Sequence, residues 1–501
     1  MPDKPAGVDD ERQGSQERES LTGAVVGGLK WSYASTFVTA ALQVGVTAVL
    51  ARLLTPSVFG LVAMASVFLR FGQYFAQMGA GQAVVQRPEL TRRDVHTAFT
   101  SAALLGVAFT VLFVSVAPLA TILFPDTADV VVVTRVMALT FTFGGLTATT
   151  QALLRRRFAF RAIALTEITT YVIGYAAVGL VLAAAGAGVW SLVAASLAQA
   201  ALAAAVYVAL CRDELGFALG YGSLKGIYSF GGRVSVIGFL EFVASNLDVL
   251  WAGHFLGARA TGLYTRATNL GNVPLYYFTS SLSRVLLPAY SRIQADRDRL
   301  RRAYLTTIML VAALAMPVAW GVAGASNAVI ATLLGDQWLD AVPVLTILSL
   351  AVPLTLLTHF GAILCEATAT LNVKILITAS RVAWLAALLI GIGRYGLVGL
   401  AAAFALSEVL THLAYVVTMR RLLAFRWREY ATACWQGVGT GIVVGITLYL
   451  LDAGLHSAEV AAAPRLLVTV GAGASLLIVS VLKVRGGQVW LELRSRWRTE
   501  A

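Results

Sequence analysis

Charged residues are scarce in this chain. Asp, Glu, Lys and Arg make up 13% of its 501 residues, whereas a soluble domain averages about 25%. Hydrophobic residues make up 58% of the chain, and its mean hydropathy is +0.77. This composition excludes a soluble globular protein and predicts an integral membrane protein.

Cysteine is scarce as well, and common enzyme signatures are missing. Cys211, Cys365 and Cys434 are far apart, and each lies in or beside an apolar stretch. This spacing favours small packing residues over a disulfide or a metal site. The sequence has no G-x-S-x-G, H-E-x-x-H or Walker A pattern, which disfavours a hydrolase, a zinc protease or an ATPase. We expect no enzyme and no cofactor, with energy coming from an ion gradient or the membrane potential.

The two ends of the chain lack an apolar core. Residues 1–22 are mostly polar and carry charges of both signs, so they predict a disordered cytoplasmic tail and not a signal peptide. Residues 484–501 are basic and contain Trp490 and Trp497. This pattern predicts a second cytoplasmic tail that lies on the inner membrane surface.

Long apolar runs dominate the rest of the chain. Each run is about as long as the ~20 residues that a helix needs to cross a bilayer, whereas a membrane barrel would show short alternating segments. The pattern predicts an all-α integral membrane protein with about 14 transmembrane helices. We expect them at 24–50, 58–80, 96–122, 130–153, 163–184, 188–210, 229–252, 264–287, 304–325, 341–365, 373–392, 396–419, 430–451 and 464–482.

The loops between these runs alternate in charge. Loops after even-numbered helices are rich in arginine, as at Arg155, Arg156 and Arg157, and loops after odd-numbered helices are poor in it. The positive-inside rule then places the arginine-rich loops and both termini in the cytoplasm. Topology and contact with anionic membrane lipids therefore explain the net charge of +12, and nucleic-acid binding is not expected.

The two halves of the chain resemble each other. ARLLTPSVFGLVA at 51–63 aligns with GHFLGARATGLYT at 253–265 after a shift of 202 residues, which places Gly60 on Gly262. A second match joins GVWSLVAA to GLVGLAAA at a later helix. Both matches fall at the same step of a six-helix unit. Because six is even, the halves have the same orientation and form a parallel repeat.

The repeat predicts two pseudo-symmetric lobes of six helices each, followed by two extra helices. The thirteenth helix carries Gly437, Gly441 and Gly445 at four-residue spacing, which is typical of tight helix packing. The expected boundaries are an N-lobe at 23–211, an inter-lobe cytoplasmic linker at 212–228, a C-lobe at 229–420, and helices thirteen and fourteen at 421–483.

Three charges interrupt the apolar stretch from Gly231 to His254. Arg233, Glu241 and Asp248 lie in this stretch, although a charge near the bilayer centre costs about 2.5–3.5 kcal/mol. Along a helix, Glu241 lies about 12 Å from the arginine and about 10 Å from the aspartate. These groups therefore cannot neutralise one another, and each needs a partner on another helix, a bound ion or a wet cavity.

Other charges fall near the middle of their spans. Arg70 lies in the second span, Arg381 in the eleventh and Glu408 in the twelfth, with His412 one turn further on. An arginine can bind phosphate through two hydrogen bonds, and a carboxylate in the membrane can bind a cation or a proton. These charges predict a substrate and ion site between the lobes. The alternative is that they form structural salt bridges.

Five motifs form an ordered set along the chain. They are RLLTPSVFGLVAMA at 52–65, LLRRRFAFRAIAL at 153–165, GAGVWSLVA at 186–194, LGARATGLYTRA at 256–267 and SRVLLPAYSRIQADRDRLRRAY at 283–304. This set resembles the bacterial polysaccharide-transport proteins, the lipid-linked oligosaccharide flippases of the multidrug/oligosaccharidyl-lipid/polysaccharide superfamily. The resemblance covers about residues 22–425.

The resemblance implies alternating access by two six-helix lobes. Such a protein would move undecaprenyl-diphosphate-linked sugar repeats from the inner to the outer leaflet of the bacterial cytoplasmic membrane, coupled to H⁺ or Na⁺. Its expected partners are this glycan, membrane lipids and other polysaccharide-assembly proteins. The two extra helices resemble those of fourteen-helix members, in which they form a hydrophobic groove for the lipid tail.

Two groups of residues are assigned to the expected cavity, with no catalytic and no metal-binding residue among them. The residues expected to bind the diphosphate or the glycan are Arg70, Arg233, Arg381, Gln73, Gln77 and Gln43. The residues expected to couple cations are Glu241, Asp248, Glu408 and His412.

Two other functions remain open at this stage. An ion-coupled multidrug or organic-cation antiporter of the same superfamily would have the same architecture, although midplane arginines suit it less well. A membrane glycan polymerase or ligase is a more remote alternative, because such enzymes usually carry a large outer loop and the longest outer loop expected here is short.

Overall fold

The structure, a computed structural model, describes residues 38–76, 84, 90–125, 127–218, 220 and 242–485. These residues form helices joined by short turns, and none of them lies in a strand. Among them, 10 helical segments are long and apolar enough to cross a membrane. The predicted all-α membrane fold is therefore confirmed, and the count of fourteen helices stays a prediction.

Contacts divide the chain into two compact units. The first unit runs to Leu54 and resumes from Ala65 to Phe239, and the second contains the segment Thr55–Met64 and everything from Leu240 onward. Helix α2 (Pro56–Ala76) thus begins in the second unit and continues in the first.

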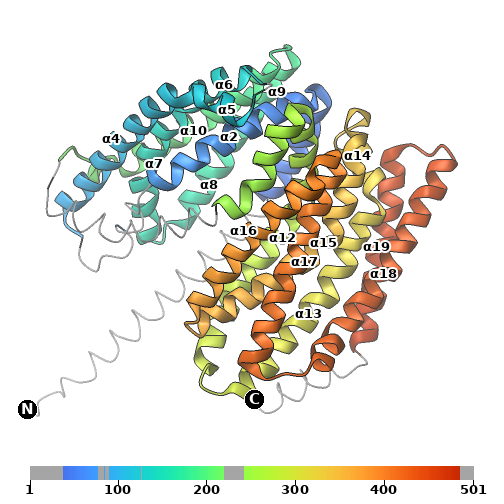
Figure 1. The fold of residues 1–501 in the computed structure, drawn as a ribbon. Helices are drawn as coiled ribbons and strands as arrows, with labels where there is room; N and C mark the ends of the chain where they lie inside the picture. The colour runs from blue at the N-terminus through green and yellow to red at the C-terminus, as the bar shows by residue number, and fades with distance from the viewer. Residues whose placement is uncertain are drawn as a thin grey trace, which may run out of the picture. The chain divides into compact units, whose positions relative to one another are not determined.

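The first unit consists of helices that run from blue to green in Figure 1. After the helix Val38–Leu53 and the main part of α2, its elements are α4 (Arg92–Val116), η1 (Ala117–Leu119), α5 (Ala120–Leu123), α6 (Asp129–Met137), α7 (Leu139–Arg156), α8 (Phe160–Thr170), η2 (Tyr171–Ala177), α9 (Val178–Ala184), α10 (Val189–Cys211) and η3 (Arg212–Glu214).

Helix α7 is the central packing element of the first unit and contacts both α4 and α10. One of its threonines, Thr142, is hydrogen-bonded to α4 inside the protein. The Thr110 hydroxyl of α4 donates to the carbonyl oxygen of Ala138 at 3.0 Å and lies 2.8 Å from the Thr142 hydroxyl. The α4 and α7 backbones approach closely, because a Cβ on Gly106 or Gly145 would overlap the facing helix.

The second unit begins with helical residues 242–251 and runs from green to red in Figure 1. Its further elements are η4 (Ala252–Leu256), α12 (Gly257–Ile293), α13 (Arg297–Gly324), α14 (Ser326–Leu333), η5 (Asp336–Ala341), α15 (Val342–Ala367), α16 (Leu371–Ile392), η6 (Gly393–Tyr395), α17 (Gly396–Leu423), α18 (Trp427–Ser457) and α19 (Ala462–Arg485).

Helix α15 lies at the centre of the second unit, where it packs against α12, α13 and α17. The interior around it is apolar: Phe360 and Leu364 of α15 are fully buried, together with Ile308 of α13 and Met419 of α17. This apolar core holds α12, α15, α16 and α17 together, and these four helices share a polar surface on one side.

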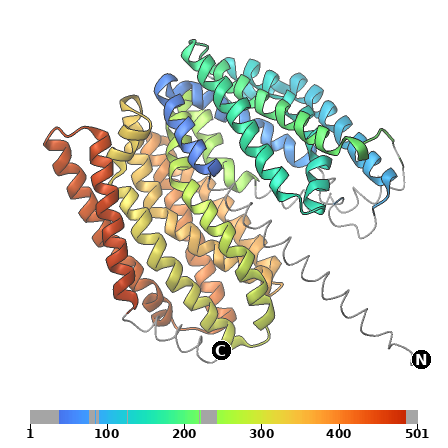
Figure 2. The same ribbon diagram turned by 180° about the vertical axis from the view of Figure 1, so that it is seen from behind.

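Helices α18 and α19 form a hairpin at the edge of the second unit, visible in red from both sides (Figures 1 and 2). The glycines of α18 pack on α13, as their spacing predicted. A Cβ on Gly437 would overlap the backbone of Ala312, and one on Gly441 or Gly445 would press against Trp320. Small residues therefore let these two helices approach closely.

A buried ion pair joins this hairpin to α14. The Arg465 guanidinium of α19 lies 3.6 Å from the Asp452 carboxylate of α18, and both side chains are at most 6% exposed. The same arginine donates to the Asn327 side chain at 2.9 Å, and the aspartate accepts from the backbone N–H of Ala328. The pair thereby caps the first turn of α14 and holds the hairpin against it.

Candidate functional site

The second unit contains a polar cavity of about 410 Å³ between residues 242–251, α12, α15, α16 and α17. A cavity of this size is in the range that binds small ligands. Its charged and titratable lining residues are His359, Glu366, Lys374, Arg381 and Glu408. Its hydroxyl-bearing lining residues are Ser245, Ser283, Thr355, Thr358, Thr378, Thr411 and Tyr415.

Helical periodicity gathers these side chains on one side of each helix. On α16 the lining residues Lys374, Thr378 and Arg381 follow at steps of four and three, which keeps them on one face. Thr355, His359 and other α15 residues repeat in the same way. Seven residues along α16 correspond to about 10 Å, so charged groups occur at two depths of the cavity.

The deeper charged group is the ion pair between Arg381 and Glu408. A guanidinium nitrogen of Arg381 lies 2.7 Å from a Glu408 carboxylate oxygen, and the side chains are 22% and 2% exposed. The other carboxylate oxygen accepts a hydrogen bond from the Thr355 hydroxyl at 2.9 Å. Both residues were predicted for the site from their mid-span positions, and the fold brings them into direct contact.

The second charged group lies near the start of α16. The Lys374 ammonium donates to the Glu366 carboxylate at 2.8 Å. About two turns before Glu366 on α15, a ring nitrogen of His359 lies 2.9 Å from the Ser283 hydroxyl of α12. The cavity thus carries one paired base at each depth, with a hydrogen-bonded histidine on its wall.

Asp248 is buried beside this cavity, at 4% exposure. Its carboxylate accepts a hydrogen bond from the Tyr264 hydroxyl of α12 at 2.7 Å and another from the backbone N–H of Val249 at 2.9 Å. The sequence predicted for Asp248 a partner on another helix, a bound ion or a wet cavity, and the Tyr264 hydroxyl is a hydrogen-bonding partner on another helix.

His412 lies behind the cavity wall and links three helices. One ring nitrogen is 3.3 Å from the Thr358 hydroxyl of α15, and the other is 3.1 Å from the Tyr430 hydroxyl of α18. Thr358 lines the cavity and His412 does not. The histidine therefore supports the cavity wall and joins it to the first turn of α18.

The remaining predicted site residues lie in the first unit or outside the described residues. Arg70 is exposed on α2, and none of the described residues forms an ion pair with it. Gln73 is half-buried and lines a small hollow with Phe141 of α7, and Gln43 is half-buried on Val38–Leu53. The three that lie outside the described residues are Gln77, Arg233 and Glu241.

Several cavity residues were not assigned to the site from the sequence. Lys374 and Glu366 lie at helix ends, where charges are common at the membrane surface, so their positions alone do not distinguish them from loop charges. His359 and the lining hydroxyls carry a weak signal, which is their repetition on one face of α15 and α16.

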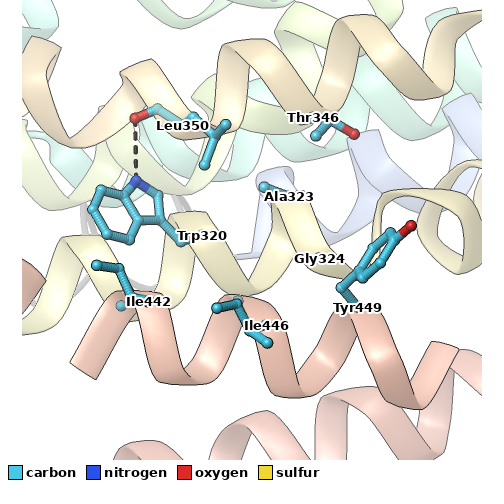
Figure 3. A pocket seen from close by; sticks show the side chains of 10 residues that line it. Trp320, Ala323, Gly324, Thr346, Leu350, Ile442, Ile446 and Tyr449 are labelled. Atoms are coloured by element: carbon cyan, nitrogen blue, oxygen red, sulfur yellow. Dashed lines mark hydrogen bonds between the residues drawn. The ribbon is translucent and has the colours of Figure 1, made fainter. Parts of the chain in front are cut away.

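An apolar groove of about 450 Å³ lies between α13, α15 and α18 (Figure 3). Its lining residues include Trp320, Leu350, Ile446 and Tyr449. The Trp320 indole donates to the Leu350 carbonyl oxygen at 3.1 Å, which fixes the ring against the wall. With the Trp320 N–H occupied in this way, the groove offers mostly apolar surface suited to a hydrocarbon chain.

Comparison with known proteins identifies the family. A family model described as "Polysaccharide biosynthesis protein" matches residues 49–343, more than half of the chain. The chain belongs to this family. The superfamily suggested by the five motifs is therefore confirmed.

Named relatives of the family have related descriptions. Teichuronic acid biosynthesis protein TuaB of Bacillus subtilis (strain 168) is 26% identical over 335 residues, covering 66% of this chain and 68% of that protein. Lipopolysaccharide biosynthesis protein WzxC of Escherichia coli (strain K12) is 24% identical over 428 residues, covering 83% and 85%. Succinoglycan biosynthesis transport protein ExoT of Rhizobium meliloti (strain 1021) is 27% identical, covering 64% and 65%.

Solved structures show the same fold. The Lipid II flippase MurJ in an inward closed conformation aligns with a TM-score of 0.71 at 13% identity, covering 91% of this chain and 99% of that one. An inward-facing multidrug resistance transporter of the MATE family aligns with a TM-score of 0.55 at 16% identity, covering 79% and 94%. The family member described here is thus a multi-pass membrane protein with a transporter fold.

Proposed function

We propose that this protein moves lipid-linked sugar repeat units of a bacterial polysaccharide from the inner to the outer leaflet of the cytoplasmic membrane, and that it is a transporter and not an enzyme. The observation that supports this most is a polar, charge-paired cavity in the second unit of a polysaccharide-biosynthesis protein. We further propose undecaprenyl diphosphate as the lipid carrier, alternating access as the mechanism and a cytoplasmic position for both termini.

The polar cavity lowers the main energetic cost of such transport, which is the removal of a polar sugar from water. Moving a polar group into an apolar environment without hydrogen bonds costs about 2–7 kcal/mol, and a sugar carries several hydroxyls. The hydroxyls and carboxylates that line the cavity can replace the lost water. A hydrated sugar head would therefore meet hydrogen-bonding partners at a depth where the lipid offers none.

The apolar groove supplies a binding surface for the lipid tail, which is the other half of a lipid-linked substrate. It lies on α18, the first of the two extra helices, and its wall includes Trp320 and Tyr449. Burying a methylene group contributes about 0.8 kcal/mol of favourable free energy, so a stretch of several carbons of an isoprenoid chain would bind in the groove. In this arrangement the tail follows the edge of the second unit while the sugar head occupies a polar path.

The charges have separate roles in this proposal. Arg70, which lies exposed on α2 without an ion pair among the described residues, would bind the diphosphate. Asp248 and Glu408 would bind the coupling H⁺ or Na⁺, since both are buried acids: Asp248 is hydrogen-bonded to Tyr264, and Glu408 is paired with Arg381. Gln73 and Gln43 would add hydrogen bonds for the head in the first unit.

The test is leaflet transfer in proteoliposomes. A fluorescent undecaprenyl-diphosphate oligosaccharide should cross the bilayer faster with the protein than without it, and an imposed pH or Na⁺ gradient should change the rate. Protein that is folded but transfers no lipid, and instead exports an organic cation against a gradient, would show a drug antiporter.

A further inference from the structure

We propose that the cavity of the second unit binds neutral sugar residues of the glycan and does not bind the diphosphate. This inference rests on the proposed function and names the part of the substrate that this cavity receives. It differs from the expectation that Arg381 contacts the diphosphate, and the reason is the charge balance of the cavity.

Both bases among the described lining residues of the cavity are paired with a carboxylate. Arg381 pairs with Glu408 at 2.7 Å, and Lys374 pairs with Glu366 at 2.8 Å. Among the described residues that line the cavity, two acids are paired with two bases. A diphosphate would bring several negative charges toward these residues, whose positive charges are already paired, and at low dielectric the repulsion from the two carboxylates is strong.

The hydrogen-bonding groups of the cavity suit sugar hydroxyls instead. The Thr378 hydroxyl donates to the backbone oxygen of Lys374 at 2.9 Å, and the Thr411 hydroxyl donates to that of Ser407 at 2.7 Å. Because their hydrogens are used inside the protein, the lone pairs of these oxygens remain available as acceptors. The Glu408 and Glu366 carboxylates also accept hydrogen bonds. The cavity is therefore rich in hydrogen-bond acceptors and suits a ligand that carries hydrogen-bond donors.

A sugar hydroxyl is a donor and brings no charge. It can donate to a threonine oxygen or a carboxylate without disturbing either ion pair, whereas a phosphate oxygen can only accept. The cavity also offers apolar surface from Ile363 and Ile377 and the ring of Tyr415, which suits the C–H faces of a sugar. The combination of acceptors, apolar faces and balanced charge therefore selects a neutral polyhydroxylated ligand.

The test compares two lipids that share the carrier and differ only in sugar. One is undecaprenyl diphosphate bearing a neutral trisaccharide, and the other is bare undecaprenyl diphosphate. Binding of each is measured to full-length protein in nanodiscs. The test variant combines Ser245→Ala and Thr378→Val, which remove two hydroxyls from the cavity wall.

We expect this double variant to bind the glycosylated lipid about tenfold more weakly, since two hydrogen bonds are lost, and to bind the bare lipid as the wild type does. The control Thr440→Val, on α18 outside the cavity, should change neither affinity. Arg70→Gln should weaken the binding of both lipids by the same factor.

The inference is overturned if the double variant weakens the binding of both lipids equally, because the cavity would then contact the shared diphosphate. It is also overturned if the double variant changes neither affinity. Wild-type protein that binds neither lipid contradicts the proposed function itself, which separates the two failures.

Discussion

Gly60 and Gly262 pack reciprocally in the second unit. A Cβ on Gly60 would overlap the carbonyl oxygen of Ala258, and a Cβ on Gly262 would overlap that of Pro56. These four residues form two pairs, each separated by the 202-residue shift that aligns the two halves of the sequence. Reciprocal contacts of this kind are what a two-fold relation between equivalent segments produces.

The close approach at Gly60 makes a clear prediction. Gly60→Ala should lower the thermal unfolding temperature in detergent, with a loss of about 1–3 kcal/mol, because the methyl group has no space against the α12 backbone. Gly45→Ala is the matched control, since a Cβ there has nothing within 4 Å. Equal unfolding temperatures for the two variants would contradict the packing.

The α13–α18 contact allows a matched pair on a single helix. Gly437→Ala should destabilise the protein, because the added Cβ overlaps the Ala312 backbone. Gly439→Ala, two residues further on, should be neutral or stabilising by about 0.5–1 kcal/mol, because its Cβ would meet open space and alanine favours a helix. Thermal unfolding of both variants measures the difference, and a destabilising Gly439→Ala would argue against this arrangement.

The Arg381–Glu408 pair should respond unequally to its two single substitutions. Arg381→Gln leaves Glu408 buried at 2% exposure without its countercharge, and breaking a buried pair in this way costs about 3–5 kcal/mol. Glu408→Gln leaves an arginine that still faces the cavity, so this substitution should lower the free energy of unfolding by less.

The double variant Arg381→Gln/Glu408→Gln should recover part of that stability, because no charge is left unpaired. A double-mutant cycle from unfolding temperatures measures the coupling. Strictly additive losses would show that the two side chains do not interact in the folded protein.

The buried pair between Arg465 and Asp452 should hold the α18–α19 hairpin in place. Arg465→Gln should cost about 3 kcal/mol and speed proteolysis at the turn after α18, because Asp452 is left unpaired in the interior. Arg259→Gln serves as control: it breaks an exposed pair with Asp340 at 2.9 Å, and such pairs contribute about 0–1 kcal/mol. Similar protease resistance in the two variants would refute the role of the buried pair.

Much of the fold could be read from the sequence because its signals are local. Apolar runs of membrane-crossing length predicted the helices, and the spacing from Gly437 to Gly445 predicted close packing without naming α13 as the partner. Arg381 and Glu408 stood out because a charge in the middle of an apolar run has a high cost. The sequence left salt bridges among the mid-span charges open as an alternative, but it could not predict that these two residues pair, since that depends on how α16 and α17 are rotated against each other.

The rest of the cavity depends on tertiary contacts that no local pattern encodes. Lys374 and Glu366 lie where membrane-surface charges usually occur, yet the fold turns them into one wall of the cavity. His412 looked like a cation-coupling residue from its place one turn after Glu408, and the fold gives it hydrogen bonds to Thr358 and Tyr430. Its role in coupling stays a prediction.

The most direct test of the account is transfer of a fluorescent undecaprenyl-diphosphate oligosaccharide between leaflets of proteoliposomes under an imposed pH or Na⁺ gradient. We expect gradient-dependent transfer by the wild type, at least a tenfold slower rate for Arg70→Gln and for Glu408→Gln, and an unchanged rate for the surface control Arg259→Gln. Transfer that continues at the wild-type rate in both site variants would show that neither Arg70 nor Glu408 takes part in transport. Absence of transfer by folded wild-type protein would contradict the proposed function.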